Sequence, residues 1–507
     1  MMKKALLFLA AATLSAGAYA EGYQVNNLSA KQTGMGHVGT AMKLGSESIY
    51  FNPAAAAFQT SRFDISAGFT GILSNVRYQS LPTVADGYKG GPAEKSDNKL
   101  STPLHVYVNY KPTERLSVGL GFFTPYGSSM NWGDDWSGAH LVQEINLAAY
   151  TVQPTVSYKL CDRVSVGAGL MITWGNFDLS RSLLSPTTRR NLIAGMLDPN
   201  IAKAQAGIAQ LEGAIAALPD GPQKEAYRQQ LQQTQGTLET LEGAKGYLSS
   251  TMDRSLVSAK LEGSAQVAVG VNAGILWDVT DEWSLGMTWR SRMNMQVGKG
   301  HATMHTDPTA AALIAQLGQL SPGTELLPQL DKGTFSTELP LPTVVTWGVS
   351  FRPAPKWELA VDLQWSGWSA YKDLNVSFNE TELGIKPIYS VKNYSNTLAF
   401  RFGGQYRATD FLTARMGMYV DESPVDSNYL NPETPSMTKV AYTAGLSLRP
   451  TDFMSIDLAY SFISSADPER TGSYPIYSYQ TGQLEEVFSG NYKLHANLFS
   501  IGLGFSF

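Results

Sequence analysis

The sequence predicts an all-β fold, a transmembrane antiparallel β-barrel of about fourteen strands. Three observations carry this prediction. Many segments alternate between apolar and polar residues, the connections between them alternate between short and long, and the amino terminus has the features of an export signal.

The export signal occupies residues 1–20. Two lysines are followed by the apolar stretch Ala5–Leu14, and Ala18-Tyr19-Ala20 forms a small-x-small cleavage site. The apolar stretch is too short to cross a bilayer as a helix. We therefore expect cleavage after Ala20 and a mature chain that begins at residue 21.

Composition narrows the classes of protein. The chain contains a single cysteine, Cys161, so it has no intramolecular disulfide framework. Its formal net charge of −5 at pH 7 gives no indication of a nucleic-acid partner. No segment after the signal is long and apolar enough for a membrane-spanning helix. An exported chain of this kind is either a secreted protein or a membrane barrel.

The last segment, 494–507, illustrates the alternation. One face carries Phe499, Ile501, Leu503, Phe505 and Phe507, and the other carries Ser500, Gly502, Gly504 and Ser506. Residues 356–366 and 453–462 repeat this pattern. Many runs reach the roughly 9–11 residues that a tilted strand needs to cross a bilayer. The apolar face is expected to meet lipid, and the small or polar face is expected to line the lumen.

The connections give stronger evidence, because barrels of the outer membrane have short periplasmic turns and longer extracellular loops. The expected strands lie near 62–76, 103–111, 116–127, 144–160, 163–181, 264–278, 283–298, 338–353, 356–378, 394–407, 411–421, 438–449, 453–464 and 494–507. Turns of a few residues alternate along the chain with long loops. A soluble sandwich has no reason to sort its loops in this way. The sequence thus indicates the outer membrane of a Gram-negative bacterium, with the terminal Phe507 as a signal for the barrel-assembly machinery.

The barrel is expected over residues 59–507, and two regions of the chain are expected to lie outside its wall. Residues 21–58 are too long for a simple lead-in, so we expect them to plug the lumen as a hatch. The long extracellular loop 182–263 contains apolar residues at helical spacing, interrupted by Pro219-Asp220-Gly221-Pro222, which predicts a helical hairpin over 190–250. A shorter helix is expected at Thr309–Leu320.

In this order along the chain, several motifs resemble the FadL-type long-chain fatty acid transporters of Gram-negative outer membranes. They are the glycine-rich start Gly34–Gly39, Asn52-Pro53-Ala54, Phe123–Gly127, Val271–Val279, Trp289–Gly298, Leu339–Val349, Trp365–Leu374, Asp421–Val425 and the terminal strand. The resemblance implies a monomeric fourteen-strand barrel with an N-terminal hatch. It further implies passive uptake of a long-chain fatty acid or another apolar compound, without a cofactor. The loop 182–263 is longer and more helical than in the best-known members.

Candidate substrate contacts follow from strand parity and from this resemblance. Strict alternation in strand 163–181 turns Phe177, Leu179 and Arg181 into the lumen, which gives an apolar wall beside one cation. An acyl chain with a carboxylate fits this combination, since Arg can hold a carboxylate through two hydrogen bonds. The resemblance implies that Arg181 and Lys392 bind the head group, with Lys386 as a competitor for the second position.

Candidate gate residues lie at the end of strand 116–127 and in the hatch. Pro125 cannot donate to the strand ladder and Gly127 permits a bend, so a gap in the wall is expected there. The resemblance places a lateral exit toward the membrane at this strand. Asn52, Pro53 and Ala54 by themselves predict a rigid turn, and the resemblance implies that this turn touches the gap.

Other signals point elsewhere with less support. The pattern Gly34-x-Gly36-x-x-Gly39 matches a dinucleotide-binding motif but lacks the βαβ context. His301 and His305 lack a third metal ligand, so no metal site is expected. None of the six histidines (37, 105, 140, 301, 305 and 495) lies near a recognisable nucleophile, which argues against an enzyme such as a lipase.

The remaining alternatives concern transport itself. Uptake of aromatic hydrocarbons is the second interpretation, and a pocket without basic residues would favour it. A general porin is a third, but it would have an open lumen and no hatch. An adhesive role for the helical loop is compatible with any of them.

Overall fold

The computed structural model describes residues 22–81, 91–320, 333–378, 388–477 and 482–507. The predicted signal peptide and Lys386 lie outside these ranges. Fourteen strands form a closed antiparallel barrel, as the sequence predicts. In chain order they are β1 (Phe63–Ser80), β3 (Leu104–Tyr110), β4 (Leu116–Asn131), β5 (Glu144–Cys161), β6 (Val164–Ser182), β7 (Val257–Asp278), β8 (Trp283–Arg290), β11 (Val344–Ala354), β12 (Trp357–Ser366), β15 (Thr397–Arg407), β16 (Leu412–Asp421), β17 (Lys439–Thr451), β18 (Met454–Ser465) and β20 (Leu484–Ser506).

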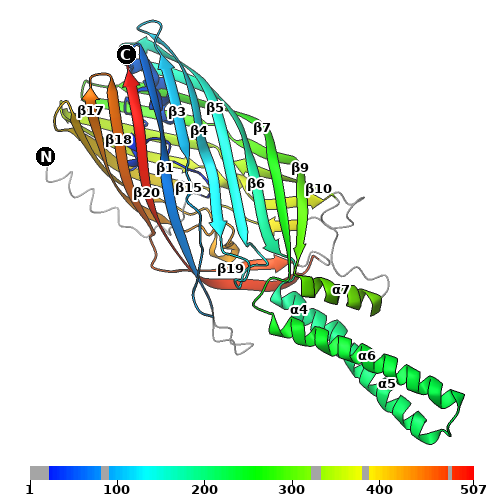
Figure 1. Cartoon of the computed structure of the whole chain (residues 1–507). Coiled ribbons are helices and arrows are strands. Elements are labelled where there is room, and N and C mark those ends of the chain that lie inside the picture. The colour runs from blue at the N-terminus through cyan, green and yellow to red at the C-terminus, as the bar shows by residue number, and fades with distance from the viewer. Residues whose placement is uncertain (1–21, 82–90, 321–332, 379–387, 478–481) are drawn as a thin grey trace.

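The first and last strands close the barrel. β1 pairs with β20 from Asp64 opposite Ser506 to Ser80 opposite Gly490, and with β3 on its other side. The short connections share one end of the barrel, which we call the turn end; they are 111–115, 162–163, 279–282, 355–356, 408–411 and 452–453. The long connections share the opposite end, which we call the loop end (Figure 1).

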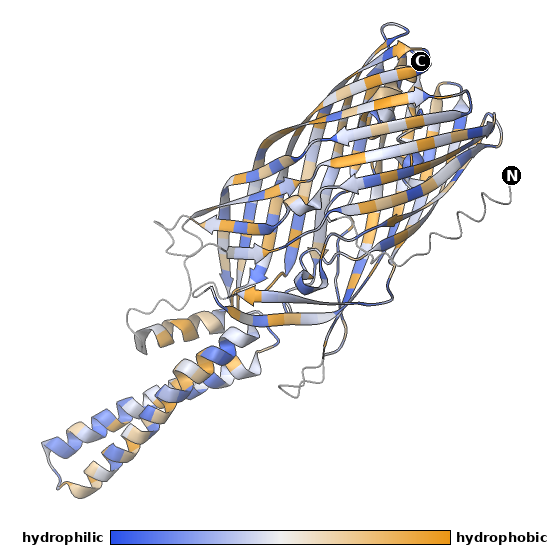
Figure 2. Cartoon of the chain, turned by 180° about the vertical axis from the view of Figure 1, so that it is seen from behind, coloured by the Kyte–Doolittle hydropathy of each residue, from blue (hydrophilic) through white to orange (hydrophobic). Residues whose placement is uncertain are grey.

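The alternation in the sequence separates the two faces of the wall. On β20, Phe499 and Leu503 are exposed on the outside, whereas Ser500 is buried in the lumen. Figure 2 shows the same alternation of apolar and polar residues along the strands around the barrel. Because apolar side chains face outward here, the wall is built for contact with lipid rather than with water.

Three expected strands are interrupted where they reach the loop end. The segments predicted as 283–298, 338–353 and 356–378 are each split into two strands. The strands at the loop end are β9 (Met293–Thr306), β10 (Thr334–Leu341) and β13 (Asp373–Phe378). The break between β10 and β11 contains Pro342, which has no N–H for the ladder. β9, β10, β13 and β14 (Ile388–Val391) pair with one another and extend the wall beyond the barrel.

Smaller strands and longer ends account for the other differences. β2 (Glu94–Lys95) pairs with β1, and β19 (Arg470–Tyr477) pairs with β20. β7 begins at Val257, so the connection from β6 is shorter than the expected loop 182–263. The alternation of apolar and polar residues continues along these strand extensions, so the sequence pattern does not mark the ends of the membrane-spanning part.

The N-terminal segment 22–58 lies inside the barrel (Figure 1, dark blue). It forms the short helices α2 (Ala30–Thr33), η1 (Gly45–Glu47), α3 (Ser48–Phe51) and η2 (Pro53–Phe58). Most of its side chains are buried, including the polar residues Gln32, Glu47 and Asn52. We call this segment the hatch.

A helical arm projects from the loop end (Figure 1). It contains α4 (Pro186–Leu192), the π-helix η3 (Ile193–Leu197), α5 (Asp198–Ala217) and α6 (Pro222–Ser250), and α7 (Pro308–Leu320) packs near its base. α5 and α6 form the predicted hairpin, with the break at 218–221. No helix among the described residues combines the length and the apolar character needed to cross a membrane.

Candidate functional site

A cluster of buried apolar side chains lies in the lumen near the loop end, and we call this region the chamber. Phe177 and Leu179 of β6 are buried in it, and the intervening Asp178 lies on the other face of the strand. The pairing of β6 with β7 shifts near Gly175, but the extra residue is on β7, where two residues lie opposite Trp174 of β6. The facing of β6 is therefore unchanged, and Phe177 and Leu179 point inward.

Arg181 follows on the same face of β6. Its Nε atom is buried and has no hydrogen-bond partner among the described residues. The charged or polar groups that act on it most are Glu433 and Tyr474. A buried guanidinium N–H without a protein partner is a donor available to a ligand.

Lys392 lies in the same neighbourhood but is already paired. Its side chain is wholly buried, its Nζ forms an ion pair with the Glu433 carboxylate, and it stands 5.9 Å from the centre of the Tyr474 ring. Glu433 and Tyr474 thus link Lys392 to Arg181. Sequence reasoning missed Glu433, which lies in the connection between β16 and β17, because nothing in the local pattern marks it as inward-facing.

His140, in the connection between β4 and β5, lies near the arginines of the chamber. Burial, together with the charges of Arg181 and Arg189, lowers the pKa of His140 to about 3. The Arg189 guanidinium is itself buried against the carbonyl groups of Leu184, Thr251 and Arg254. Burial is the main cause of the shift at His140, and the two guanidinium groups contribute positive charge to this part of the molecule.

A gap in the ladder occurs in β4, where the sequence predicts it. β3 and β4 pair only as far as His105 opposite Phe123, and the pairing of β4 with β5 shifts between Phe123 and Tyr126. The hatch bonds to the freed backbone: Val25 N donates to Pro125 O (2.9 Å) and Gly127 N donates to Tyr23 O (3.0 Å). Residues 23–25 thus cover the kinked part of the wall from inside.

Asn52, Pro53 and Ala54 lie elsewhere, and the expectation that they touch this gap is wrong. The Asn52 side chain donates to Thr40 O and Ile275 O, whereas the carbonyls of Pro53 and Ala54 accept from Ser157 and Ser165. These contacts hold the turn against β5, β6 and β7. Its rigid geometry was predicted, but its position depends on how the hatch folds back in the lumen.

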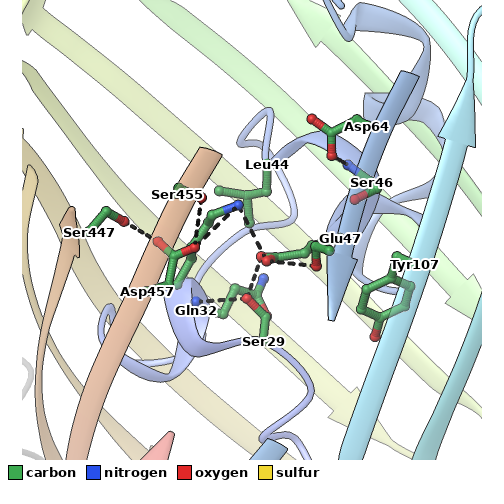
Figure 3. Close-up of polar contacts among 12 residues, drawn as sticks. Ser29, Gln32, Leu44, Ser46, Glu47, Asp64, Tyr107, Ser447, Ser455 and Asp457 are labelled. Atoms are coloured by element: carbon green, nitrogen blue, oxygen red, sulfur yellow. Dashed lines mark hydrogen bonds and ion pairs between the residues drawn. The ribbon is translucent and has the colours of Figure 1, made fainter. Parts of the chain in front are cut away.

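Buried charges tie the hatch to the wall (Figure 3). Lys31 Nζ lies 3.3 Å from Glu47 of the hatch and 3.9 Å from Asp457 of β18, and Ser66 of β1 also donates to Glu47. On another side, Asp362 of β12 accepts from Gly39 N and from both Thr40 N and Thr40 Oγ1. The hatch from residue 29 onward is thus fixed by charge-assisted hydrogen bonds.

Wall glycines let the hatch backbone come close. A Cβ on Gly417 would lie 2.3 Å from the carbonyl carbon of Met35, and one on Gly286 would lie 2.1 Å from Thr40 O. Both distances are far below van der Waals contact. These inward positions accept only glycine while the hatch is in place.

Among the described residues, no three side chains of His, Cys, Asp or Glu are grouped so that they could hold a metal ion. His301 and His305 are both exposed on the outside of β9.

A closed barrel with outward apolar residues, a lumen hatch and a buried chamber defines a transport protein of the outer membrane. The chain matches the family model described as outer membrane protein transport protein (OMPP1/FadL/TodX) over residues 11–507. It therefore belongs to that family, whose members transport or conduct hydrophobic compounds across the outer membrane of Gram-negative bacteria, and this confirms the resemblance and the localisation.

Individual relatives are distant in sequence but match most of the chain or all of it. Outer membrane protein P1 of Haemophilus influenzae is 22% identical over 100% of both chains, and the long-chain fatty acid transport protein of Escherichia coli is 22% identical over 91% of this chain and 92% of its own. Among solved structures, a Pseudomonas aeruginosa FadL homologue has a TM-score of 0.69 at 18% identity, covering 96% of this chain and 100% of its own. The P. putida toluene transporter TodX has a TM-score of 0.62 at 15% identity, covering 95% and 99%.

Proposed function

We propose that this protein takes up long-chain fatty acids passively across the outer membrane, as a monomer. One observation carries the proposal: the buried Nε of Arg181, which has no hydrogen-bond partner among the described residues, lies beside the apolar wall of Phe177 and Leu179. A fatty acid satisfies both features, because its carboxylate accepts from Arg181 and each buried CH2 contributes about 0.8 kcal/mol.

The charges support an acid rather than a neutral hydrocarbon. Lys392 is balanced by Glu433, which leaves Arg181 as the cation that a substrate can neutralise. The pKa of His140 is depressed mainly by burial, and the positive charges of Arg181 and Arg189 add to that effect. The name of the E. coli relative agrees with this substrate class.

The proposed route has three parts. Substrate enters from the extracellular loop end, binds in the chamber, and leaves sideways through the gap near Pro125 and Gly127 after residues 23–25 withdraw. Asn52, Pro53 and Ala54 keep the remainder of the hatch against β5–β7 during this step. The two parts of the hatch are attached to the wall differently, which supports this route. Residues 23–25 contact β4 through two backbone hydrogen bonds, whereas later hatch residues are held by buried charges.

Uptake of labelled long-chain fatty acid tests the proposal, in cells that lack their own transporter. Arg181→Ala at equal surface abundance is expected to lower uptake about tenfold or more, as expected for loss of a hydrogen-bonded charge contact. Arg190→Ala, an exposed arginine on α4, is the matched control and should leave uptake unchanged. Failure of the unmodified protein to take up fatty acid would contradict the proposal and favour aromatic hydrocarbons.

A further inference from the structure

Around Tyr23 the hatch and the wall form an aromatic cage, which we define by Tyr126 of β4 and by Trp368 and Tyr371 beyond β12. The Tyr23 ring centre lies 4.7 Å from that of Trp368, 5.7 Å from Tyr371 and 6.3 Å from Tyr126, with interplanar angles of 79°, 85° and 60°. These are favourable edge-to-face and tilted arrangements. The cage therefore fits one planar ring.

The cage also offers hydrogen bonds. The Tyr23 hydroxyl donates to the carbonyl of Pro340 in β10. The indole Nε1 of Trp368 is buried and has no partner among the described residues. A ring that carries a hydroxyl can meet the Pro340 acceptor as Tyr23 does.

The position of the cage relates it to the gap in the wall. Tyr126 belongs to the kinked part of β4, and its neighbours Pro125 and Gly127 hold Val25 and Tyr23 by backbone hydrogen bonds. A ring in the cage therefore stands directly inside the gap. Withdrawal of residues 23–25 would empty the cage and uncover the gap in the same movement.

We propose that the aromatic cage is a binding site for a phenol-sized planar ring and that Tyr23 occupies it as an internal ligand. The inference goes beyond the proposed function, because a planar ring is a different kind of ligand from a fatty acid. It adds an aromatic site, separate from Arg181, that is available only when the start of the hatch moves away. A phenolic compound should fit better than a hydrocarbon ring, because it replaces the hydrogen bond of the Tyr23 hydroxyl.

Removal of the Tyr23 side chain provides the test, using full-length protein in detergent and equilibrium dialysis with labelled phenol. Tyr23→Ala is expected to bind one equivalent of phenol about tenfold or more tightly than the unmodified protein, because Tyr23 no longer competes for the site. Toluene should bind more weakly than phenol to the same variant. Tyr23→Phe keeps the ring and should behave like the unmodified protein.

Phe51→Ala is the matched control, because it removes an aromatic ring that packs on Tyr50 in another part of the hatch. Tyr23→Ser serves as a second truncation if Tyr23→Ala does not fold, and it should give the same result. Equal phenol binding by the unmodified protein and both truncations would overturn the proposal, as would equal binding by Phe51→Ala. Fatty acid uptake by the unmodified protein is measured separately, so failure of the transport proposal is distinguishable from failure of the cage.

Discussion

At the scale of single residues, the chamber depends on a charge balance among Arg181, Lys392 and Glu433. The Nε of Arg181 is buried and finds no acceptor in the described part of the chain, whereas Lys392 forms an ion pair with Glu433. A cation already neutralised by a protein carboxylate gains less from a substrate carboxylate than an unpaired one does. We therefore assign the two basic residues different roles, with Arg181 as the ligand contact and Lys392 as the partner that keeps Glu433 from cancelling it.

Breaking the buried pair tests this assignment. Lys392→Met leaves the Glu433 carboxylate buried without its partner and is expected to lower the free energy of unfolding by about 3 kcal/mol and to weaken fatty acid binding. The double variant Lys392→Met with Glu433→Gln should recover most of both losses. Denaturant unfolding and ligand titration in detergent measure them. Equal effects of the single and double variants would contradict the assignment.

A second prediction concerns His140 and the dependence of the protein's stability on pH. Its pKa is about 3 in the folded protein and near 6.5 in an unfolded chain, so the unfolded state binds a proton first as the pH falls. The stability that neutral His140 contributes is present above about pH 6.5 and is lost progressively toward about pH 3. His140→Gln should therefore lose less thermal stability between about pH 7.5 and about pH 5 than the unmodified protein. His301→Gln, at an exposed position, should show no such difference in its Tm.

At the scale of elements, the seat of the hatch depends on glycines in the wall. Gly417→Val would push β16 against the backbone of Met35 and Gly36 and is expected to unseat the hatch. Entry of a large hydrophilic antibiotic into cells measures the resulting leak. Gly298→Val, on the outside of β9 next to the flexible Gln266 side chain, is the control. An intact permeability barrier in Gly417→Val would show that the hatch is not held by this close fit.

The helical arm should be dispensable for the barrel itself. Its apolar base, which includes Ile201, Leu241 and Leu248, packs toward β7 and α7, whereas the outer parts of α5 and α6 contact mainly each other. Replacing residues 208–234 with a short Gly-Ser turn is therefore expected to leave the Tm and fatty acid uptake unchanged. Reduced uptake with an unchanged Tm would instead give the arm a part in capture.

At the scale of the whole molecule, the outer face of the barrel exposes large apolar side chains that suit contact with lipid. Met416 is more exposed than Met418, the other exposed methionine of β16, and Phe411 lies outside at the adjacent turn. Met416→Arg should cost about 2–4 kcal/mol because it puts a charge near the membrane midplane, and Phe411→Arg should cost about 0–1 kcal/mol at the interface. Unfolding from phospholipid vesicles compares the two. Equal costs would contradict the proposed depth of β16.

Strand number, order and facing were predictable, because each wall strand alternates over its own length and a one-residue slip would turn its apolar face into the lumen. The hairpin of α5 and α6 was predictable from local spacing as well. Breaks such as that at Pro342 were missed, since the alternation continues on both sides of the break.

By itself, the sequence determined the export signal pattern, the fourteen-strand barrel and the inward face of β6 with Arg181, since each depends on neighbouring residues in the chain. Only the tertiary structure decided the partners: Glu433 with Lys392, Tyr23 in its aromatic cage, and Asn52 against β7 rather than at the gap. These contacts join residues tens to hundreds of positions apart. The closure of the barrel and the path of the hatch inside it bring them together, and no local pattern encodes either.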